Sequence, residues 1–306
     1  MLAFLLRRTA AMVPTLLVII TLAFFLIRLA PGGPFDLDRP LDSATMANLK
    51  RVYGLDRSLP EQYLSYLRAL VGGDFGPSLV IRDFSVGEIF ARGLPVSIRI
   101  GGLALLLALI AGLGLGIAAA LRRNRAVDYL VMTVATLGLS VPTFVTAPLF
   151  QLFFGLSLAW LPVGGWNDGA WRNTVLPVLT LALPQVAVIA RLTRAAMIET
   201  LRAHHIRTLR AQGLGTATIV RHALRGALLP VLSYLGPAAA HLLTGSLVVE
   251  TIFGLPGIGR YFIEGALSRD YTLVMGTVVV IALFVLIFNI LVDLAYALLD
   301  PRVRHG

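Results

Sequence analysis

The sequence predicts an all-α integral membrane protein with about six transmembrane helices and an external segment between the first and the second. Of its 306 residues, 57% are hydrophobic and only 14% are charged, and the mean hydropathy is +0.83. A soluble protein of this size could not bury so many apolar side chains in its core. The apolar residues also gather in uncharged runs near the length of about 20 residues that a helix needs to cross a bilayer. The lipid bilayer is therefore the expected surrounding.

Six apolar runs give the expected spans. Five of them approach or exceed the spanning length and cover residues 9–27, 100–121, 129–161, 226–249 and 271–292. The third is long enough for one span followed by a hydrophobic re-entrant segment or loop. The sixth run, 173–190, contains Pro177 and Pro184, and we interpret it as a span. We expect the first helix and the external segment in residues 1–94, and a core of five helices in residues 95–306.

The arginines indicate the orientation of the chain, whose net charge is +10. If the N-terminus is cytoplasmic, the cytoplasmic side carries 14 arginines, whereas two short external loops carry only Arg172, Arg260 and Arg269. This bias predicts that both termini are cytoplasmic. It also explains the basic composition without nucleic acid as a partner. The first apolar run is too long for a cleaved signal peptide, so we expect it to stay attached.

The external segment, residues 31–94, contains one predicted helix. Ser58-Leu59-Pro60-Glu61 has the pattern of a capping box with proline in the first turn. Leu64, Leu67 and Val71 then recur at helical spacing. The pattern predicts a short amphipathic helix that lies on the membrane surface or packs on the outer ends of the other helices.

Glycines and prolines within the spans indicate close helix packing. Gly112 and Gly116 have the spacing that lets a second helix approach closely. Prolines in the third and fourth spans free backbone carbonyl groups, which a lipid-exposed helix tolerates poorly. We therefore expect these two helices to face protein or an aqueous path; the prolines are Pro142, Pro148, Pro177 and Pro184.

The arginine-rich stretch from Arg191 to Pro230 has the most informative pattern. It predicts a helix over 191–212 that leaves the membrane, a turn at Gly213, and a second helical piece that returns to the bilayer. A loop that serves only to orient the chain is the alternative interpretation. Small residues such as Thr208 and Ala211, a glycine turn and exposed arginines instead suit a surface that docks into another protein.

The residues of this loop resemble a known family. Residues 206–214, Ile-Arg-Thr-Leu-Arg-Ala-Gln-Gly-Leu, resemble the EAA loop of ABC-importer permeases of the dipeptide and oligopeptide class. The resemblance covers essentially the whole chain and is strongest to the B-type subunit of oligopeptide permeases. Further matching segments are residues 29–32, 73–78, 189–194, 221–224, 227–230, 245–259, 269–271 and 299–302.

This resemblance implies a type I ABC-importer permease fold in a bacterial inner membrane. It implies pairing with a second related permease, two cytoplasmic ATP-binding subunits and an external peptide-binding protein, with peptide as the substrate. The ATPase-coupling loop would lie at about 195–226, with contacts from Arg207, Thr208, Arg210, Ala211, Gly213 and Leu214. Leu209 and Gln212 depart from the alanine and lysine that are more usual in the family.

The chain does not carry its own ATPase or another enzyme activity in this interpretation. Its single lysine, Lys50, lies in the external segment, so no phosphate-binding loop faces the cytoplasm. An intramembrane serine protease is disfavoured because His241 and Ser246 lie about 140° apart around their helix. No cysteine is present, and the histidines lack metal-ligand spacing, so we predict no metal and no cofactor.

An ion-coupled secondary transporter is the alternative function. It would need carboxylates near the middle of the membrane, and Asp128, Glu250 and Asp293 instead lie near expected helix ends. Polar residues within spans are candidates for the translocation path, although hydrogen bonding between helices is the commoner use of such residues. The candidates are Gln151, Gln185, His241 and Asn289.

Overall fold

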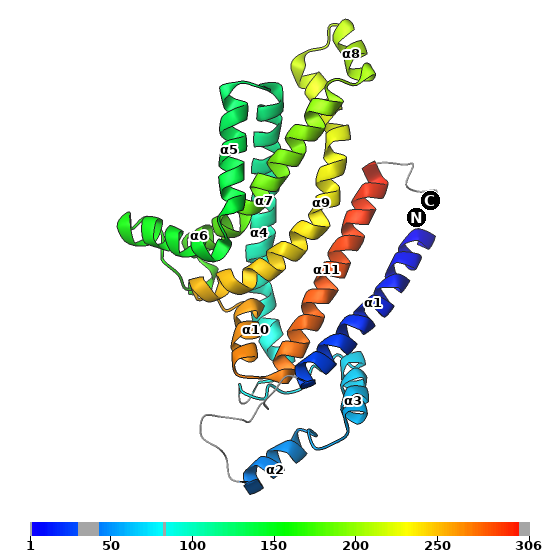
Figure 1. The fold of residues 1–306 in the computed structure, drawn as a ribbon, viewed down its shortest axis with the longest axis vertical. Helices are drawn as coiled ribbons and strands as arrows, with labels where there is room; N and C mark the ends of the chain where they lie inside the picture. The colour runs from blue at the N-terminus through cyan, green and yellow to red at the C-terminus, as the bar shows by residue number, and fades with distance from the viewer. Residues whose placement is uncertain (1, 30–42, 82–83, 300–306) are drawn as a thin grey trace.

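The computed structural model describes residues 2–29, 43–81 and 84–299, and its regular structure there is helical (Figure 1). The helices are α1 (Leu2–Leu29), α2 (Ser43–Val52), α3 (Leu59–Val71), α4 (Val86–Leu121), α5 (Ala126–Ser140), α6 (Thr143–Phe150), the π-helical η1 (Gln151–Ser157), the short η2 (Asn167–Gly169), α7 (Trp171–Thr200), α8 (His204–Ala211), α9 (Thr216–Phe253), α10 (Ile258–Leu267) and α11 (Tyr271–Leu299). Residues 30–32 and 300–302, which belong to segments that resemble the permease family, lie outside the described residues. So do Arg302 and Arg304, which were counted among the cytoplasmic arginines.

Five helices are long and apolar enough to cross a membrane: α1, α4, α7, α9 and α11. The sixth candidate span is bent, because α5 and the segment formed by α6 and η1 meet at 103°. α5 has 15 residues, which gives a length of about 22 Å, less than the roughly 30 Å of hydrocarbon. The bend falls at Val141, which is extended ahead of Pro142. The expected re-entrant piece agrees with the break at Val141, but α5 before the break is shorter than the predicted full span.

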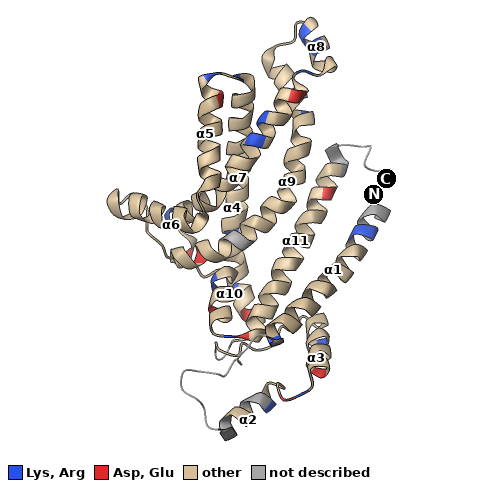
Figure 2. Cartoon of the chain, viewed as in Figure 1, with Lys and Arg blue, Asp and Glu red and all other residues tan. Residues whose placement is uncertain are grey.

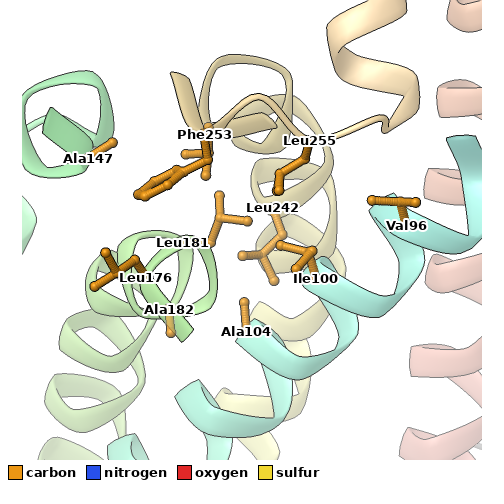
Figure 3. Close-up of a cluster of buried hydrophobic side chains, with 11 residues drawn as sticks. Val96, Ile100, Ala104, Ala147, Leu176, Leu181, Ala182, Leu242, Phe253 and Leu255 are labelled. Atoms are coloured by element: carbon orange, nitrogen blue, oxygen red, sulfur yellow. The ribbon is translucent and has the colours of Figure 1, made fainter. Parts of the chain in front are cut away.

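α7 lies at the centre of the bundle, with α4, α5 and α9 around it (Figure 1). It continues as one helix through Pro177 and Pro184, and more than half of its most apolar window is buried. Its Leu176 and Leu181 pack against Ile100 of α4 and other buried side chains in the main apolar cluster (Figure 3). The prediction that the proline-containing spans face protein is confirmed for this fourth span, whereas Pro142 and Pro148 of the third span are exposed.

Gly112 and Gly116 of α4 allow this helix to approach α7 closely. A Cβ atom on Gly112 would lie 2.7 Å from Ile189 Cβ, and one on Gly116 would lie 2.5 Å from Thr193 Cβ. These distances are shorter than ordinary van der Waals contacts. The predicted small-residue packing motif is therefore used between these two helices.

α3 packs against the C-terminal part of α1. The Tyr63 ring lies 5.3 Å from that of Phe24, and its hydroxyl lies 2.6 Å from that of Thr21. Of the three apolar residues in the pattern, Leu67 packs on this face, whereas Leu64 and Val71 are 53% and 92% exposed. Tyrosines pack here instead, since their rings cover apolar surface while their hydroxyl groups find polar partners. The packed face of α3 consists of Tyr63, Tyr66, Leu67 and Leu70.

Candidate functional site: the loop that contains α8

The loop between α7 and α9 contains a separate short helix. The helix expected over 191–212 is interrupted, because α7 ends at Thr200 and Ala203 is extended (ψ 151°) before α8 begins at His204. The expected second piece is also not separate, since α9 runs unbroken from Thr216 through Pro230. The interruption turns α8 so that one of its faces rests on the bundle.

An apolar underside holds α8 in place. Ile206 is fully buried, and Leu209 packs partly against the same cluster. The cluster joins the ends of α4, α7 and α9 beneath α8, and its buried members are Ala120, Ala196, Met197, Ile206, Ile219, Ala223 and Ala227. An eight-residue helix is not stable by itself in water. Burial of Ile206 therefore stabilises α8 in this position.

The outer face of α8 and the turn after it carry the residues predicted for the coupling loop. The six side chains or backbone positions are all exposed: Arg207, Thr208, Arg210, Ala211, Gly213 and Leu214. Arginines lie at this end of the molecule, both at α8 and in the turn between α4 and α5 (Figure 2). Within the described part of the chain, Arg207 and Arg210 form no ion pair. The outer face therefore presents positive charge beside small side chains, which suits docking against a protein surface.

Gly213 ends α8 with a left-handed backbone. Its φ is +75°, and its N–H donates to the carbonyl of Arg210 at 3.0 Å. Leu214 N–H donates to the carbonyl of Leu209 at 3.2 Å, so the two bonds close the last turn. A Cβ atom at Gly213 would meet nothing within 4 Å. The backbone conformation, not the available space, therefore requires glycine here.

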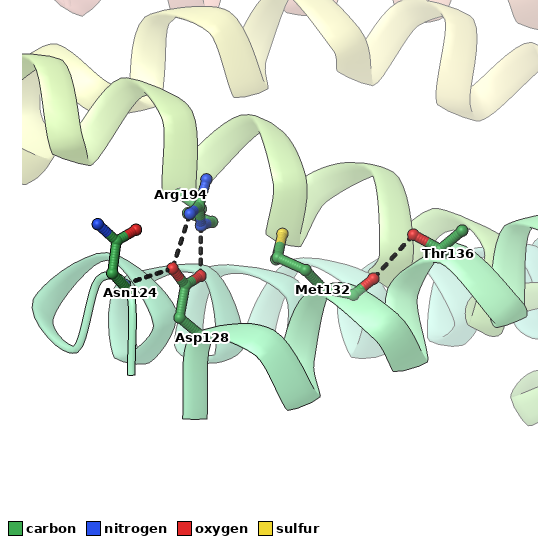
Figure 4. A network of polar contacts seen from close by, with 5 residues as sticks. All are labelled: Asn124, Asp128, Met132, Thr136 and Arg194. Atoms are coloured by element: carbon green, nitrogen blue, oxygen red, sulfur yellow. Dashed lines mark hydrogen bonds and ion pairs between the residues drawn. The ribbon is translucent and has the colours of Figure 1, made fainter. Parts of the chain in front are cut away.

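A buried ion pair fixes α7 just before this loop. Arg194 of α7 contacts Asp128 of α5 through two nitrogen atoms, Nε to Oδ1 and Nη2 to Oδ2, the latter at 2.7 Å (Figure 4). The backbone N–H of Asn124 also donates to Asp128 Oδ2, at 2.9 Å. Sequence reasoning noted Asp128 only as a carboxylate near a helix end. No local pattern could reveal its partner, which is 66 residues away.

Two of the predicted path residues make hydrogen bonds that hold the fold together. Gln151 Nε2 donates to the carbonyl groups of Val163 and Ile252, at 2.6 and 3.2 Å. Gln185 is buried and its Oε1 accepts a hydrogen bond from the Tyr234 hydroxyl at 2.8 Å. These contacts favour the structural alternative for both glutamines.

Asn289 lies in a different environment. It lines a cavity of about 440 Å³ between α1, α9 and α11, together with Ser233, Asp293 and Tyr296. Gln151, Gln185 and His241 do not line this cavity, so the structure does not bring the four predicted path residues together. His241 is exposed on α9. Of the four, Asn289 has the geometry that a path residue requires.

The three carboxylates considered for ion coupling are held by protein groups. Asp128 pairs with Arg194, and Asp293 pairs with Arg8 at 2.9 Å. Glu250 is fully buried and its Oε2 accepts the N–H of Gly259 at 2.8 Å. Each carboxylate thus ties one element to another, which gives a structural reason for its place near a helix end.

The apolar helical bundle, together with the exposed loop between α7 and α9 (the docking loop, residues 201–215), indicates a membrane-spanning transport subunit. Residues 112–305 match the family described as binding-protein-dependent transport system inner membrane component, and residues 1–97 match the corresponding N-terminal family. The chain belongs to this family. It is a multi-pass membrane protein with the type I ABC-importer permease fold.

Curated relatives are similar along the whole chain. The oligopeptide transport system permease protein OppB of Escherichia coli (strain K12) is 48% identical over 306 residues, which cover 100% of both chains. OppB of Haemophilus influenzae is 45% identical over the same share of both chains. The dipeptide transport system permease protein DppB of Bacillus subtilis (strain 168) is 45% identical over 98% of this chain and 97% of its own. The chain is therefore a permease subunit and not an enzyme, and separate subunits carry the ATPase.

Proposed function

We propose that the chain is one of two related permeases in an importer that moves oligopeptides or dipeptides across a bacterial inner membrane. The peptide cargo is proposed from the names of the relatives, which are oligopeptide and dipeptide permeases similar over the full chain. The observation that carries the coupling proposal is the exposed, arginine-containing face of α8 above the buried Ile206. Such a face can dock on one of two cytoplasmic ATP-binding subunits.

The same proposal gives the orientation. The ends of α1 and α11 that carry the two termini point toward the end of the bundle that carries α8 (Figure 1). Because arginines gather at that end (Figure 2), we assign it to the cytoplasm, with both termini. α3 and α10 lie at the opposite, external end, where a peptide-binding protein would deliver its cargo.

The proposed mechanism is alternating access. ATP binding closes the two ATP-binding subunits and displaces the loop at Gly213, α7 and α9 move with the loop, and the paired permeases switch from outward to inward access. No covalent step takes place on this chain. The residues at α8 therefore act by position and contact, through the rigid attachment of Ile206 and Leu209 to the bundle.

The test is reconstitution of the complete transporter in lipid vesicles. The chain is co-expressed with its neighbouring permease, ATPase and binding-protein genes, and ATP hydrolysis and uptake of radiolabelled trialanine are measured with and without the binding protein. We expect stimulated hydrolysis and uptake, and we expect Gly213→Arg to abolish assembly or coupling. Uptake by the chain alone under an ion gradient, without ATP, would refute the proposal and favour a secondary transporter.

A further inference from the structure

α5 packs against α4 and α7 along its length, and its buried residues are Asp128, Val131, Ala135 and Gly138. Between its two ends the side chains of α4, α5 and α7 leave an apolar cavity of about 170 Å³, lined by Leu115, Val134 and Val186 among others. At the external end of α5, a Cβ atom on Gly138 would lie 3.4 Å from Leu183 Cγ, which is close packing. At the other end the attachment is the ion pair of Asp128 with Arg194. The ion pair therefore adds a polar link between α5 and α7 at the end beside the loop, next to their apolar packing.

This ion pair is buried and satisfied by several donors. The Asp128 side chain is 3% exposed and that of Arg194 is 27% exposed. Two nitrogen atoms of the guanidinium group and the backbone N–H of Asn124 share the carboxylate (Figure 4). One side chain thus joins the turn between α4 and α5 to α7. Removal of Arg194 would leave the buried Asp128 carboxylate with the Asn124 N–H as its remaining donor among these groups, which is unfavourable.

The ion pair lies between the docking loop and the bent end of the third span. Arg194 is less than two turns from Thr200, where α7 ends and the loop begins. On the other side, α5 continues into α6 and η1, whose Gln151 binds the carbonyl of Ile252 near the external end of α9. A displacement of α7 can therefore reach the external half of the bundle through α5.

We propose that Asp128 and Arg194 are positioning residues that make α5 and α6 follow α7 when an ATP-binding subunit displaces α8. This inference rests on the proposed function. Without the ion pair between Asp128 and Arg194, α7 would move past α5. The external ends of α5 and α6 would then lag behind. ATP hydrolysis would then continue while transport is lost.

The transport test uses single substitutions in the complete reconstituted complex. Asp128→Ala and Arg194→Ala are expected to lower trialanine uptake about tenfold, within the range of 5- to 150-fold that is typical of coupling between sites. Binding-protein-stimulated ATP hydrolysis is expected to remain. The exchanged pair, Asp128→Arg with Arg194→Asp, is expected to recover part of the uptake. Glu264→Ala is the matched control, because the exposed Glu264 side chain pairs with Arg260 at 2.7 Å within α10 and the pair joins no two elements.

A distance measurement separates positioning from simple stability. The chain has no cysteine, so spin labels can be placed at exposed Leu137 of α5 paired with Glu199 of α7, or with Leu291 of α11. We expect ATP to leave the 137–199 distance unchanged and to shift the 137–291 distance in the unsubstituted protein. With Asp128→Ala, or the isosteric Asp128→Asn if the alanine variant does not assemble, ATP should also change the 137–199 distance.

The outcomes distinguish this inference from the proposed function. Normal uptake by an assembled Asp128→Ala complex, or an unchanged 137–199 distance in that complex, would overturn the inference and leave the proposed function intact. An exchanged pair as inactive as the single variants would also overturn it. Absence of ATP-dependent uptake by the unsubstituted complex would overturn both.

Discussion

Replacement of Gly116 by alanine tests whether glycine sets the spacing between α4 and α7. A new Cβ atom would lie 2.5 Å from Thr193 Cβ and 2.7 Å from the carbonyl oxygen of Ala190. Ordinary contacts between carbon atoms are about 3.5 to 4.0 Å, so α7 must move away by roughly 1 Å at this crossing. The neighbouring contact of Gly112 with Ile189 would loosen as a result.

Gly114→Ala is the matched control for this substitution. Gly114 lies on the same helix, between the two packed glycines, and a Cβ atom there would meet nothing within 4 Å. Both substitutions gain the same helix propensity, about 1 kcal/mol. The difference between their free energies of unfolding therefore reports the strain of overpacking at Gly116. Such strain is about 1–3 kcal/mol for a well-packed site. We expect Gly116→Ala to be less stable than Gly114→Ala by this amount.

The assay is unfolding of the purified chain in detergent micelles by added sodium dodecyl sulfate, followed by circular dichroism. The free energies of unfolding of the two variants are compared at the same detergent fraction. If Gly116→Ala unfolds at the same midpoint as Gly114→Ala, the close crossing does not exist in the folded protein and the packing argument fails. Gly112→Ala should behave like Gly116→Ala, since its Cβ would also overlap α7.

Three further predictions concern the loop and the external segment. Ile206→Ala removes a buried side chain worth about 2–5 kcal/mol, so α8 should detach and ATPase copurification should fall, whereas Leu267→Ala, at an exposed position of α10 away from the loop, should retain it. Gly213→Val should reduce binding-protein-stimulated hydrolysis more than Gly213→Asn, because the left-handed backbone costs a branched residue about 1–2 kcal/mol and asparagine less; equal effects would contradict this reason. Hydrogen bonds from Ser58 lower the pKa of Glu61. The ionised Glu61 side chain therefore contributes its full stabilisation of α3 above the unfolded pKa of about 4.3. This stabilisation is lost as pH falls through the lower folded pKa. Hydrogen exchange of α3 amides should show this loss, and Glu61→Ala should remove the pH dependence.

Hydropathy predicted most of the spans because each long apolar run must cross or enter the bilayer. It could not predict the 103° bend between α5 and α6, since Pro142 permits many directions and neighbouring helices select one. The sequence pattern also could not predict which face of α3 packs on α1, because Leu64 and Tyr63 are both apolar enough to pack. The contact with Phe24 of α1, a distant part of the chain, determines that Tyr63 packs on the bundle while Leu64 stays exposed.

The outer face of the docking loop could be predicted, but its attachment could not. Exposed arginines and a turn glycine are local features, and Gly213 has the left-handed backbone that such a turn requires. Ile206, by contrast, differs little in sequence from other apolar residues of the loop. Its burial depends on Met197 and Ala223, which come from two different helices. The same limit applies to Asp128, whose role depends on Arg194.

The polar residues of the spans show how the structure narrows the search for the translocation path. A polar side chain in a bilayer needs a partner, so its presence in a span indicates either a hydrogen bond between elements or contact with water. Gln151 and Gln185 have protein partners, whereas Asn289 lines the cavity between α1, α9 and α11. α1 and α11, which line this cavity together with α9, lie on the side of α9 away from α7 (Figure 1). If α7 and α9 move together while α11 stays, the walls beside Asn289 change their separation, so access along this side should depend on ATP.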